Sequence, residues 1–397
     1  MKLKFLKTLL ASSALLIAGV ASPAFAQQGV TAQEITIGAL GPLTGSTAFI
    51  GAPSRDGMQM AVDTINKRGG INGRKLKLVF EHAFSPAESV AAAKKLVEQD
   101  KVFALVLASG STGAAAAADY VRSAGVPTYN LFGSTPVIRE PFAANVFHGA
   151  VASTEVTAGA LVAQLARAGE KKPQRVGVLV GSYAYPQANL AVLKPLLEKQ
   201  GVALTLETFD QNAKDFTAQL VNLSRNKNKV DAVVVLGSFT EAGFAIKQAP
   251  QVGLMNVRWV LDGSAVNNAI IPIIGNADGI RGYYNAPYYP GQNAKPMEDF
   301  EALWKTTYGT PPQGRPNLFD IVGYGSTFVL AQAIQAAGND LTWKGLIGKW
   351  DTLKGAAPSK MGGFDVIYPE TFTPKDHQGN KLLGATEVVK NKWVVVK

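Results

Sequence analysis

The chain of 397 residues contains no cysteine, and only 17% of its residues are charged. The absence of cysteine excludes a disulfide framework, a thiolate zinc site, an iron–sulfur cluster and a cysteine nucleophile. Because 47% of the residues are hydrophobic, the low charge does not indicate disorder, and the chain can bury a sizeable core. The length favours two or more lobes over a single core.

The common catalytic motifs are also missing. The sequence has no Gly-x-Ser-x-Gly, no Gly-Lys-Ser/Thr phosphate loop and, after the first expected strand, no Gly-x-Gly-x-x-Gly. The three histidines, His82, His148 and His377, are scattered, and none has a partner at metal-ligand spacing. We therefore expect no enzyme activity, no catalytic residue, no cofactor and no metal site.

Basic residues outnumber acidic ones by 39 to 29, which gives a formal net charge of +10. The basic clusters, at residues 171–172, 225–229 and 390–392, are small and are not interleaved with aromatic residues, as a nucleic-acid-binding surface would require. A solvated surface explains them, and we expect no nucleic-acid partner.

Residues 1–26 have the order of a secretory signal peptide: lysines, an apolar run over residues 9–20, and then Ala24-Phe25-Ala26. The competing interpretation is a membrane anchor, but this apolar run is too short to span a bilayer comfortably. No cysteine follows the run, which argues against a lipid anchor. We expect cleavage after Ala26 and a mature protein that is exported to the periplasm and soluble.

From residue 34 onward, short apolar stretches alternate with helical patterns in two successive runs. The first run predicts strands at residues 34–40, 75–80, 103–107 and 126–130, and helices at residues 54–67, 86–99 and 112–124. The second predicts strands at residues 175–180, 203–209, 230–236 and 257–261, and helices at residues 154–168, 187–200, 215–225 and 240–251. This alternation predicts an α/β protein with two doubly wound, mainly parallel sheets.

After the second run the pattern becomes mostly helical. Helices are expected at residues 295–308, 317–335 and 341–350, and strand-like alternation at residues 385–396. A largely helical ending suggests that the chain returns to cover the first lobe.

Ligands of open α/β sheets bind beyond the carboxyl ends of the strands, so the loops that follow strands are the places to search. Ser109, Ser111 and Thr112 lie at the start of an expected helix, where free N–H groups and the helix dipole favour an anion such as a ligand carboxylate. Ser134 follows the next strand. Simple N-capping or an ordinary turn would produce the same residues, and both interpretations stay open.

In the second run, Asp262 is the one acid of these strand-end loops, and it could pair with a ligand ammonium or cap a helix near residue 264. Tyr183, Tyr185 and Phe239 also follow strands. They could form an apolar wall of a binding site, although aromatic residues at strand ends more often serve packing alone.

Several stretches carry a family resemblance. Residues 61–76, Ala-Val-Asp-Thr-Ile-Asn-Lys-Arg-Gly-Gly-Ile-Asn-Gly-Arg-Lys-Leu, follow Gly41-Pro42-Leu43-Thr44-Gly45, and residues 214–216 and 323–326 add to the pattern. With these motifs the chain, from residue 34 to its end, resembles the periplasmic Leu/Ile/Val-binding family of ABC-transporter substrate-binding proteins, which are type I periplasmic binding proteins.

The resemblance implies two α/β lobes, joined by a three-crossover hinge, that close on a small molecule and then dock on a membrane permease. In this scheme residues 27–149 and 285–355 form the first lobe, and residues 150–284 and 356–397 form the second. The resemblance implies a monomer whose partners are a small-molecule ligand, most simply an amino acid, and ABC permease subunits.

The resemblance also implies roles for single residues. Ser109 and Ser134 match positions that hold an α-carboxylate, while the carbonyl of Phe132 and the carboxylate of Asp262 match the ammonium site. Tyr185 and Phe239 match positions that close over the ligand.

The sequence departs from the family pattern at several of these positions. Phe132 is bulkier than the residue often found there, Phe239 lacks a hydroxyl, and Asp262 is one methylene shorter than Glu. Phe49 and Ile50 stand where a Tyr is common in the first-lobe wall.

These features predict a periplasmic solute receptor of an ABC importer for branched-chain or other hydrophobic L-amino acids. Asp262 favours an amino acid, because a buried carboxylate beside a ligand that carries only a carboxylate is unfavourable. The alternatives are a receptor for aromatic carboxylates, small amides or urea, and a sensor that signals to a membrane receptor. An exported hydrolase is disfavoured by the missing nucleophile motif.

Overall fold

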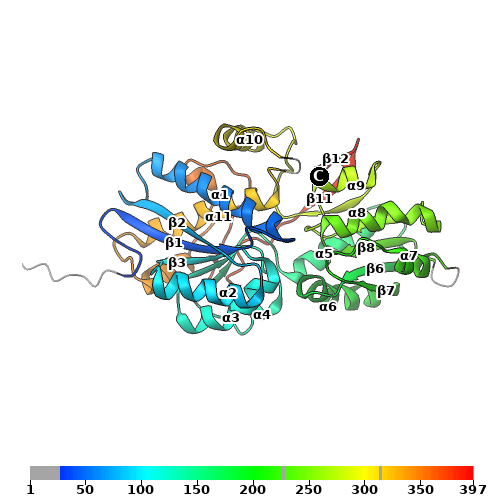
Figure 1. Cartoon of the computed structure of the whole chain (residues 1–397), viewed down its shortest axis with the longest axis horizontal. Coiled ribbons are helices and arrows are strands. Elements are labelled where there is room, and N and C mark those ends of the chain that lie inside the picture. Colours follow the sequence, from blue (N-terminus) through cyan, green and yellow to red (C-terminus); the bar gives the residue numbers. More distant parts are fainter. Residues whose placement is uncertain (1–26, 226–228, 313–314, 397) are drawn as a thin grey trace, which may run out of the picture.

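The structure is a computed structural model that describes residues 27–225, 229–312 and 315–396; the expected signal peptide and its cleavage site lie outside these residues. Two α/β lobes lie side by side (Figure 1). The first lobe contains a parallel sheet of order β2-β1-β3-β4-β5. Its strands are β1 (Glu34–Gly41), β2 (Lys75–His82), β3 (Ala104–Leu107), β4 (Thr128–Asn130) and β5 (Val146–His148).

The second lobe contains a sheet of order β12-β11-β10-β9-β8-β6-β7. Pairing is parallel from β7 to β10 and antiparallel between β10, β11 and β12. Its strands are β6 (Arg175–Gly181), β7 (Ala203–Phe209), β8 (Ala232–Leu236), β9 (Arg258–Leu261), β10 (Arg281–Tyr284), β11 (Gly384–Val389) and β12 (Lys392–Val396). The predicted fold class, two mainly parallel sheets in two lobes, is confirmed.

Helices cover both faces of each sheet because successive strand residues point to opposite sides. In the first lobe, α1 (Ala48–Lys67) and α11 (Leu318–Ala337) pack together over one face, and α2 (Pro86–Lys94) and α3 (Gly110–Ala124) over the other. In the second lobe, α5 (Thr154–Leu165) and α6 (Ala184–Lys199) lie opposite α7 (Thr217–Ser224) and α8 (Phe239–Gln248). Shorter or peripheral helices are α4 (Pro136–Arg139), α9 (Ile271–Ile274), α10 (Lys295–Tyr308) and α12 (Trp343–Trp350).

Three segments connect the lobes, after β5, after β10 and before β11. Residues 356–379, which the sequence analysis assigned to the second lobe, lie against the first: Phe372 packs on Tyr129 with ring centroids 6.5 Å apart, and His148 forms a bridge with Gln378. We therefore propose that the third crossover lies at residues 380–383.

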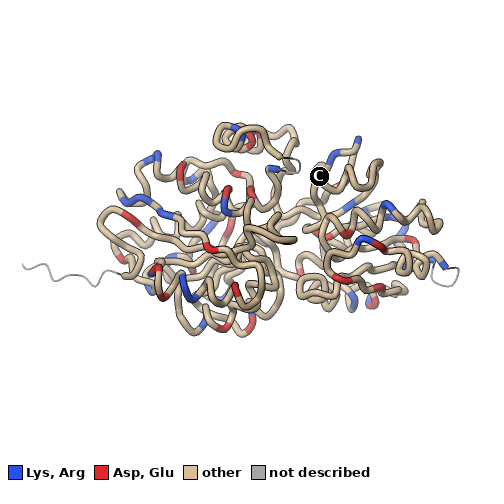
Figure 2. Tube along the Cα trace, viewed as in Figure 1, with Lys and Arg blue, Asp and Glu red and all other residues tan. Residues whose placement is uncertain are grey.

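Charge is dispersed over the molecule. In the view of Figure 2 the Lys and Arg residues are scattered along both lobes and interspersed with Asp and Glu. No helix of the described ranges has the length and apolar character that a membrane crossing requires.

Candidate ligand site between the lobes

Helix α3 follows β3 after a short turn, and Ser109 is its N-cap residue. The capping interpretation concerned Ser111 or Thr112, but α3 begins at Gly110, so both residues lie inside the helix and neither is its N-cap; the Ser109 side chain, at the N-cap, makes no capping hydrogen bond either. Ser111 is buried, and its Oγ accepts a hydrogen bond of 3.1 Å from the backbone N–H of Ser134. The structure therefore brings Ser109, Ser111 and Ser134 together, whereas Thr112 is exposed.

Several hydroxyls in this region are buried without a partner. Ser109 Oγ, Ser134 Oγ and Thr135 Oγ1 have no hydrogen-bond partner among the described residues. Buried polar atoms are nearly always paired, so unpaired ones mark a place where a bound group could complete the hydrogen bonds. The first N–H groups of α3 also lack acceptors within the helix, which adds donors for an anion.

The loop that carries Ser134 is held in place by neighbouring side chains. Asn130 at the end of β4 exchanges two hydrogen bonds with Gly133, at 2.7 and 2.9 Å, and Arg139 Nη1 donates to the Gly133 carbonyl at 2.7 Å. The Arg139 Nη2 group also donates to Gln378 Oε1 at 2.8 Å, which ties the loop to the segment before the third crossover. These contacts hold the loop in place, and none of them involves the Ser134 hydroxyl.

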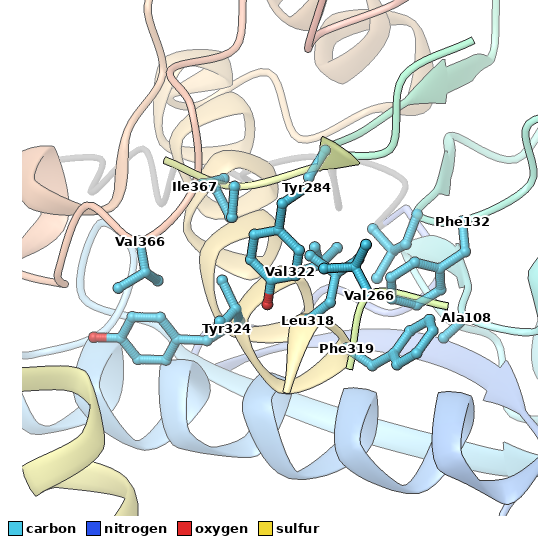
Figure 3. Close-up of a cluster of buried hydrophobic side chains, with 14 of the residues drawn as sticks. Ala108, Phe132, Val266, Tyr284, Leu318, Phe319, Val322, Tyr324, Val366 and Ile367 are labelled. Atoms are coloured by element: carbon cyan, nitrogen blue, oxygen red, sulfur yellow. The ribbon is translucent and has the colours of Figure 1, made fainter. Parts of the chain in front are cut away.

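An aromatic cluster formed by Phe49, Phe132, Phe239 and Phe319 lies at the junction of the two lobes. Phe319, in the first turn of α11, meets Phe132 at 5.0 Å and Phe49 at 5.7 Å between ring centroids, both edge to face. Phe49 in α1 also meets Phe239 of α8 at 5.5 Å. Phe239 belongs to the second lobe, so this last contact joins the lobes. Figure 3 shows Phe132 and Phe319 side by side, with Ala108 and Val266 next to them.

Phe319 did not appear among the candidates from sequence. Its neighbours Phe49 and Phe132 lie far upstream in the chain, and no local pattern connects them with α11. One sequence feature could have indicated Phe319: it lies at the start of the helix expected at residues 317–335, in the part of the chain that was expected to return to the first lobe.

Asp262 lies after β9 and is completely buried. Its Oδ1 accepts hydrogen bonds from the Ser264 N–H at 2.7 Å and the Tyr185 hydroxyl at 3.2 Å, and lies 2.6 Å from Ser264 Oγ. Its Oδ2 accepts from the Gly237 N–H at 2.7 Å. Burial raises the pKa of Asp262 to about 6, although these hydrogen bonds pull the pKa in the opposite direction.

Tyr185 therefore lies beside Asp262, and its hydroxyl is also 3.3 Å from that of Tyr283. Burial raises the pKa of the Tyr185 phenol well above its usual value. Tyr183 turns to a different acid, and its hydroxyl donates to Glu241 Oε2 at 2.9 Å. The structure thus groups the candidates of the second lobe as Asp262 with Tyr185, and places Phe239 apart from them at the contact with Phe49.

Comparisons with known proteins agree with this architecture. Residues 34–392 match the model of a family described as periplasmic binding protein. Two proteins of Pseudomonas aeruginosa are similar: an amino acid binding protein, 28% identical and covering 77% of this chain and 79% of its own, and a leucine-, isoleucine-, valine-, threonine- and alanine-binding protein, 27% identical and covering 81% and 84%.

Solved structures with the same fold include a periplasmic binding protein type 1 from Bordetella pertussis, with a TM-score of 0.76, 24% identity and coverage of 90% of this chain and 97% of that one. The substrate-binding protein LivJ from Streptococcus pneumoniae, in complex with isoleucine, has a TM-score of 0.76, 21% identity and coverage of 91% and 99%. The chain belongs to the periplasmic binding protein family, and its relatives include proteins named as amino-acid-binding and as Leu/Ile/Val-binding proteins.

Proposed function

We propose that the chain is the solute-binding component of an ABC importer and that its lobes close on a small hydrophobic molecule anchored by a carboxylate. The observation that carries the proposal is a pair of buried hydroxyls, of Ser109 at the start of α3 and of Ser134 in the loop after β4, which have no hydrogen-bond partner among the described residues. They lie in the lobe that contributes Phe132 to the aromatic cluster. Hydroxyl and N–H donors suit a carboxylate, and the aromatic rings suit an apolar body.

Hydrophobic L-amino acids, the ligand class expected from the sequence, are supported by the names of the relatives, which are amino-acid-binding proteins. Aromatic carboxylates are the second candidate, and the aromatic cluster of both lobes favours them. Small amides and urea are less suited to a site that combines serine hydroxyls with the N-terminus of α3.

The remaining expectations are part of the same proposal. The protein works as a monomer in the periplasm after cleavage behind Ala26, and it delivers its ligand to membrane permease subunits without catalysing a reaction. A sensor that uses the same lobe closure to signal to a membrane receptor is the alternative, and the genes beside this one distinguish the two roles.

Thermal unfolding with added solutes tests the proposal. The protein is freed of bound ligand by unfolding and refolding, and is then heated with Leu, Ile, Val, Phe, benzoate, small amides or urea. A ligand at 100 times its Kd stabilises the native state by about 2.7 kcal/mol, which gives a clear rise in Tm. We expect a rise with hydrophobic carboxylates and none with amides or urea.

Two variants test whether the ligand carboxylate binds at Ser134. Ser134→Ala removes a buried hydroxyl that has no partner within the described ranges. This variant should reduce the ligand-induced rise in Tm, while the Tm of the unliganded protein changes little. Ser123→Ala removes an exposed hydroxyl from the other end of α3 and serves as the control. Loss of the rise in both variants, or in neither, contradicts the proposed carboxylate site.

A further inference from the structure

Gln378 lies where the first and the third connections between the lobes meet. Its backbone forms a bridge with His148 at the end of β5, and its side chain is buried, with 9% of the residue exposed. The Nε2 group lies within hydrogen-bond distance of the carbonyls of Gly149, Val151 and Asn380, at 3.1, 3.2 and 2.9 Å. The first lobe therefore holds the backbone of Gln378, while its amide holds the two connecting segments.

Two asparagines add hydrogen bonds between the connections. Asn380 Nδ2 donates to the Ala150 carbonyl at 2.6 Å and to the Leu382 carbonyl at 3.0 Å. Asn285, directly after β10 in the second connection, accepts from the Ala152 N–H at 3.2 Å. When two lobes move about a hinge, a few connecting residues absorb the change in φ and ψ. Hydrogen bonds to these residues therefore depend on how the lobes are arranged.

Arg139 sets the direction in which the Gln378 amide points. Its Nη2 donates to Gln378 Oε1 at 2.8 Å. Because a guanidinium has donors only, it binds the oxygen end of the amide and leaves the NH2 end facing the connecting segments. The Nη1 group of the same guanidinium donates at 2.7 Å to the carbonyl of Gly133, the residue before Ser134. One side chain thus joins the loop of the candidate ligand site to the residue that holds the connections.

The second lobe also acts on Arg139. Burial lowers the pKa of Arg139 to about 10, and the charge of Glu155 opposes this effect. Glu155 stands in the first turn of α5, which begins the second lobe after the first connection. Arg139 keeps its charge at neutral pH, so it continues to orient the Gln378 amide.

Resting on the proposed function, we propose that Gln378 is a positioning residue for ligand binding: its amide, oriented by Arg139, holds the connecting segments in the arrangement in which the aromatic cluster joins the lobes. Neither residue needs to touch the solute. A solute that orders the Ser134 loop also orders its contact with Arg139, and so favours this arrangement. The coupling is reciprocal: lobes held in this arrangement keep the Ser134 loop ordered for the solute.

A distance between the lobes tests the inference without a ligand. Because the chain has no cysteine, Ser46→Cys and Gln211→Cys introduce two unique sites for spin labels, in exposed loops after β1 and β7 on different lobes. Double electron–electron resonance then gives the distribution of distances between the labels. We expect Gln378→Ala to shift this distribution by several ångströms towards longer distances in the unliganded protein. An unchanged distribution overturns the inference.

Gln332 provides the matched control. It is buried to a similar extent, with 7% exposed, and its Nε2 also donates to main-chain carbonyls, of Phe328 at 3.1 Å and of Ala357 at 2.8 Å. Phe328 belongs to α11, and Ala357 to the segment that lies against the first lobe. We expect both Gln332→Ala and Gln378→Ala to lower the Tm, but only Gln378→Ala to change the distance. Equal shifts of distance in the two variants would overturn the inference.

Arg139→Lys tests the orienting step, and it gives an answer even if Gln378→Ala does not fold. Lysine keeps the charge but lacks the rigid fork that binds the Gly133 carbonyl and the Gln378 oxygen together. This variant should shift the distance in the same direction as Gln378→Ala. The double variant should shift it no further than Gln378→Ala alone, because both changes act through one hydrogen bond. An unshifted Arg139→Lys, or a double variant that shows the sum of both shifts, overturns the inference.

Titration with solutes separates this inference from the proposed function. L-leucine and benzoate are the probes, and the one that raises the Tm of wild type is used. It should bind Gln378→Ala at least about fivefold more weakly, because fewer molecules have the binding-competent arrangement, and Gln332→Ala as tightly as wild type. Equal affinity in Gln378→Ala and wild type overturns the inference and leaves the proposed function intact. If no solute raises the Tm, the proposed function fails, and the distances in the unliganded protein still decide whether Gln378 positions the lobes.

Discussion

Glu370 is a carboxyl buried in the first lobe. Its Oε2 accepts a hydrogen bond of 2.5 Å from the Tyr129 hydroxyl, and its Oε1 has no partner among the described residues. Burial raises the pKa of Glu370 from 4.5 to about 8, although the bond from Tyr129 lowers it. The native state therefore keeps a proton here that the unfolded chain releases near pH 4.5.

This difference predicts how stability depends on pH. Between pH 4.5 and about 8 the native state binds more protons at Glu370 than the unfolded state, so stability falls as pH rises through this range and levels off above it. The whole change is of the order of 5 kcal/mol. Urea unfolding of wild type and Glu370→Gln from pH 5 to 9 measures it, because other groups cancel in the difference. A constant difference between the two proteins would contradict the prediction.

Single residues of the candidate site could be predicted only where they follow a strand directly. Ser109, Ser134 and Asp262 stand at strand ends, and the strand pattern placed them at the sheet edge. Whether a side chain there is free or already satisfied depends on tertiary partners such as Tyr185 for Asp262. The contact of Phe319 with Phe132 joins residues far apart in sequence, and no local pattern contains it.

At the scale of secondary-structure elements, α1 and α11 pack unusually closely through glycines. A Cβ atom at Gly57 would lie 2.1 Å from the Asp320 carbonyl oxygen, and one at Gly323 would lie 2.4 Å from the Ser54 carbonyl oxygen. Each helix thus presents a glycine to the backbone of the other, and a side chain at either position would force the helices apart.

Gly57→Ala should therefore destabilise the protein by about 1–3 kcal/mol, as overpacking does, even though alanine is the better helix former. Gly159→Ala in α5 is the matched control, since a Cβ there meets nothing within 4 Å. This control should stabilise the protein by about 0.5–1 kcal/mol. Urea unfolding measures both, and changes of the same sign would contradict the packing argument.

The long elements could be predicted well and the short ones could not. The pattern predicted α10 at the residues where it occurs, because its apolar residues recur with helical spacing. The strands β5 and β10 are three and four residues long, too short for a periodic signal. The strand-like residues 385–396 form the hairpin of β11 and β12, which turns at Lys390 and Asn391, where φ is 51° and 55°.

The start of α1 differs from the prediction for a related reason. The helix was predicted to start at residue 54, after Gly51 and Pro53, which are poor helix formers. In the structure it begins at Ala48. Packing decides the conformation of this first part: a Cβ at Gly51 would lie 2.3 Å from the Pro42 carbonyl oxygen. Tertiary contact therefore outweighs local propensity in the segment that carries Phe49.

At the scale of the whole molecule, Phe49 of α1 and Phe239 of α8 form a contact between the two lobes. Each ring belongs to a different lobe, so under the proposed hinge motion their contact should be lost when the lobes separate. An edge-to-face pair contributes about 0.5–1.5 kcal/mol beyond its buried area. The affinity of a ligand that binds between the lobes includes the free energy of lobe closure, so a contact that stabilises the closed form increases that affinity.

A double-mutant cycle on Phe49→Ala and Phe239→Ala isolates this contribution to closure. Each single variant should weaken ligand binding, and the double variant should lose less than the sum, with a coupling of about 0.5–1.5 kcal/mol that appears mainly as faster ligand release. Stopped-flow dissociation measures the effect. Small-angle scattering of the unliganded variants should show a larger radius of gyration than wild type, because the open form gains population. Additive losses, or unchanged scattering in all variants, would mean that the two rings do not hold the lobes together.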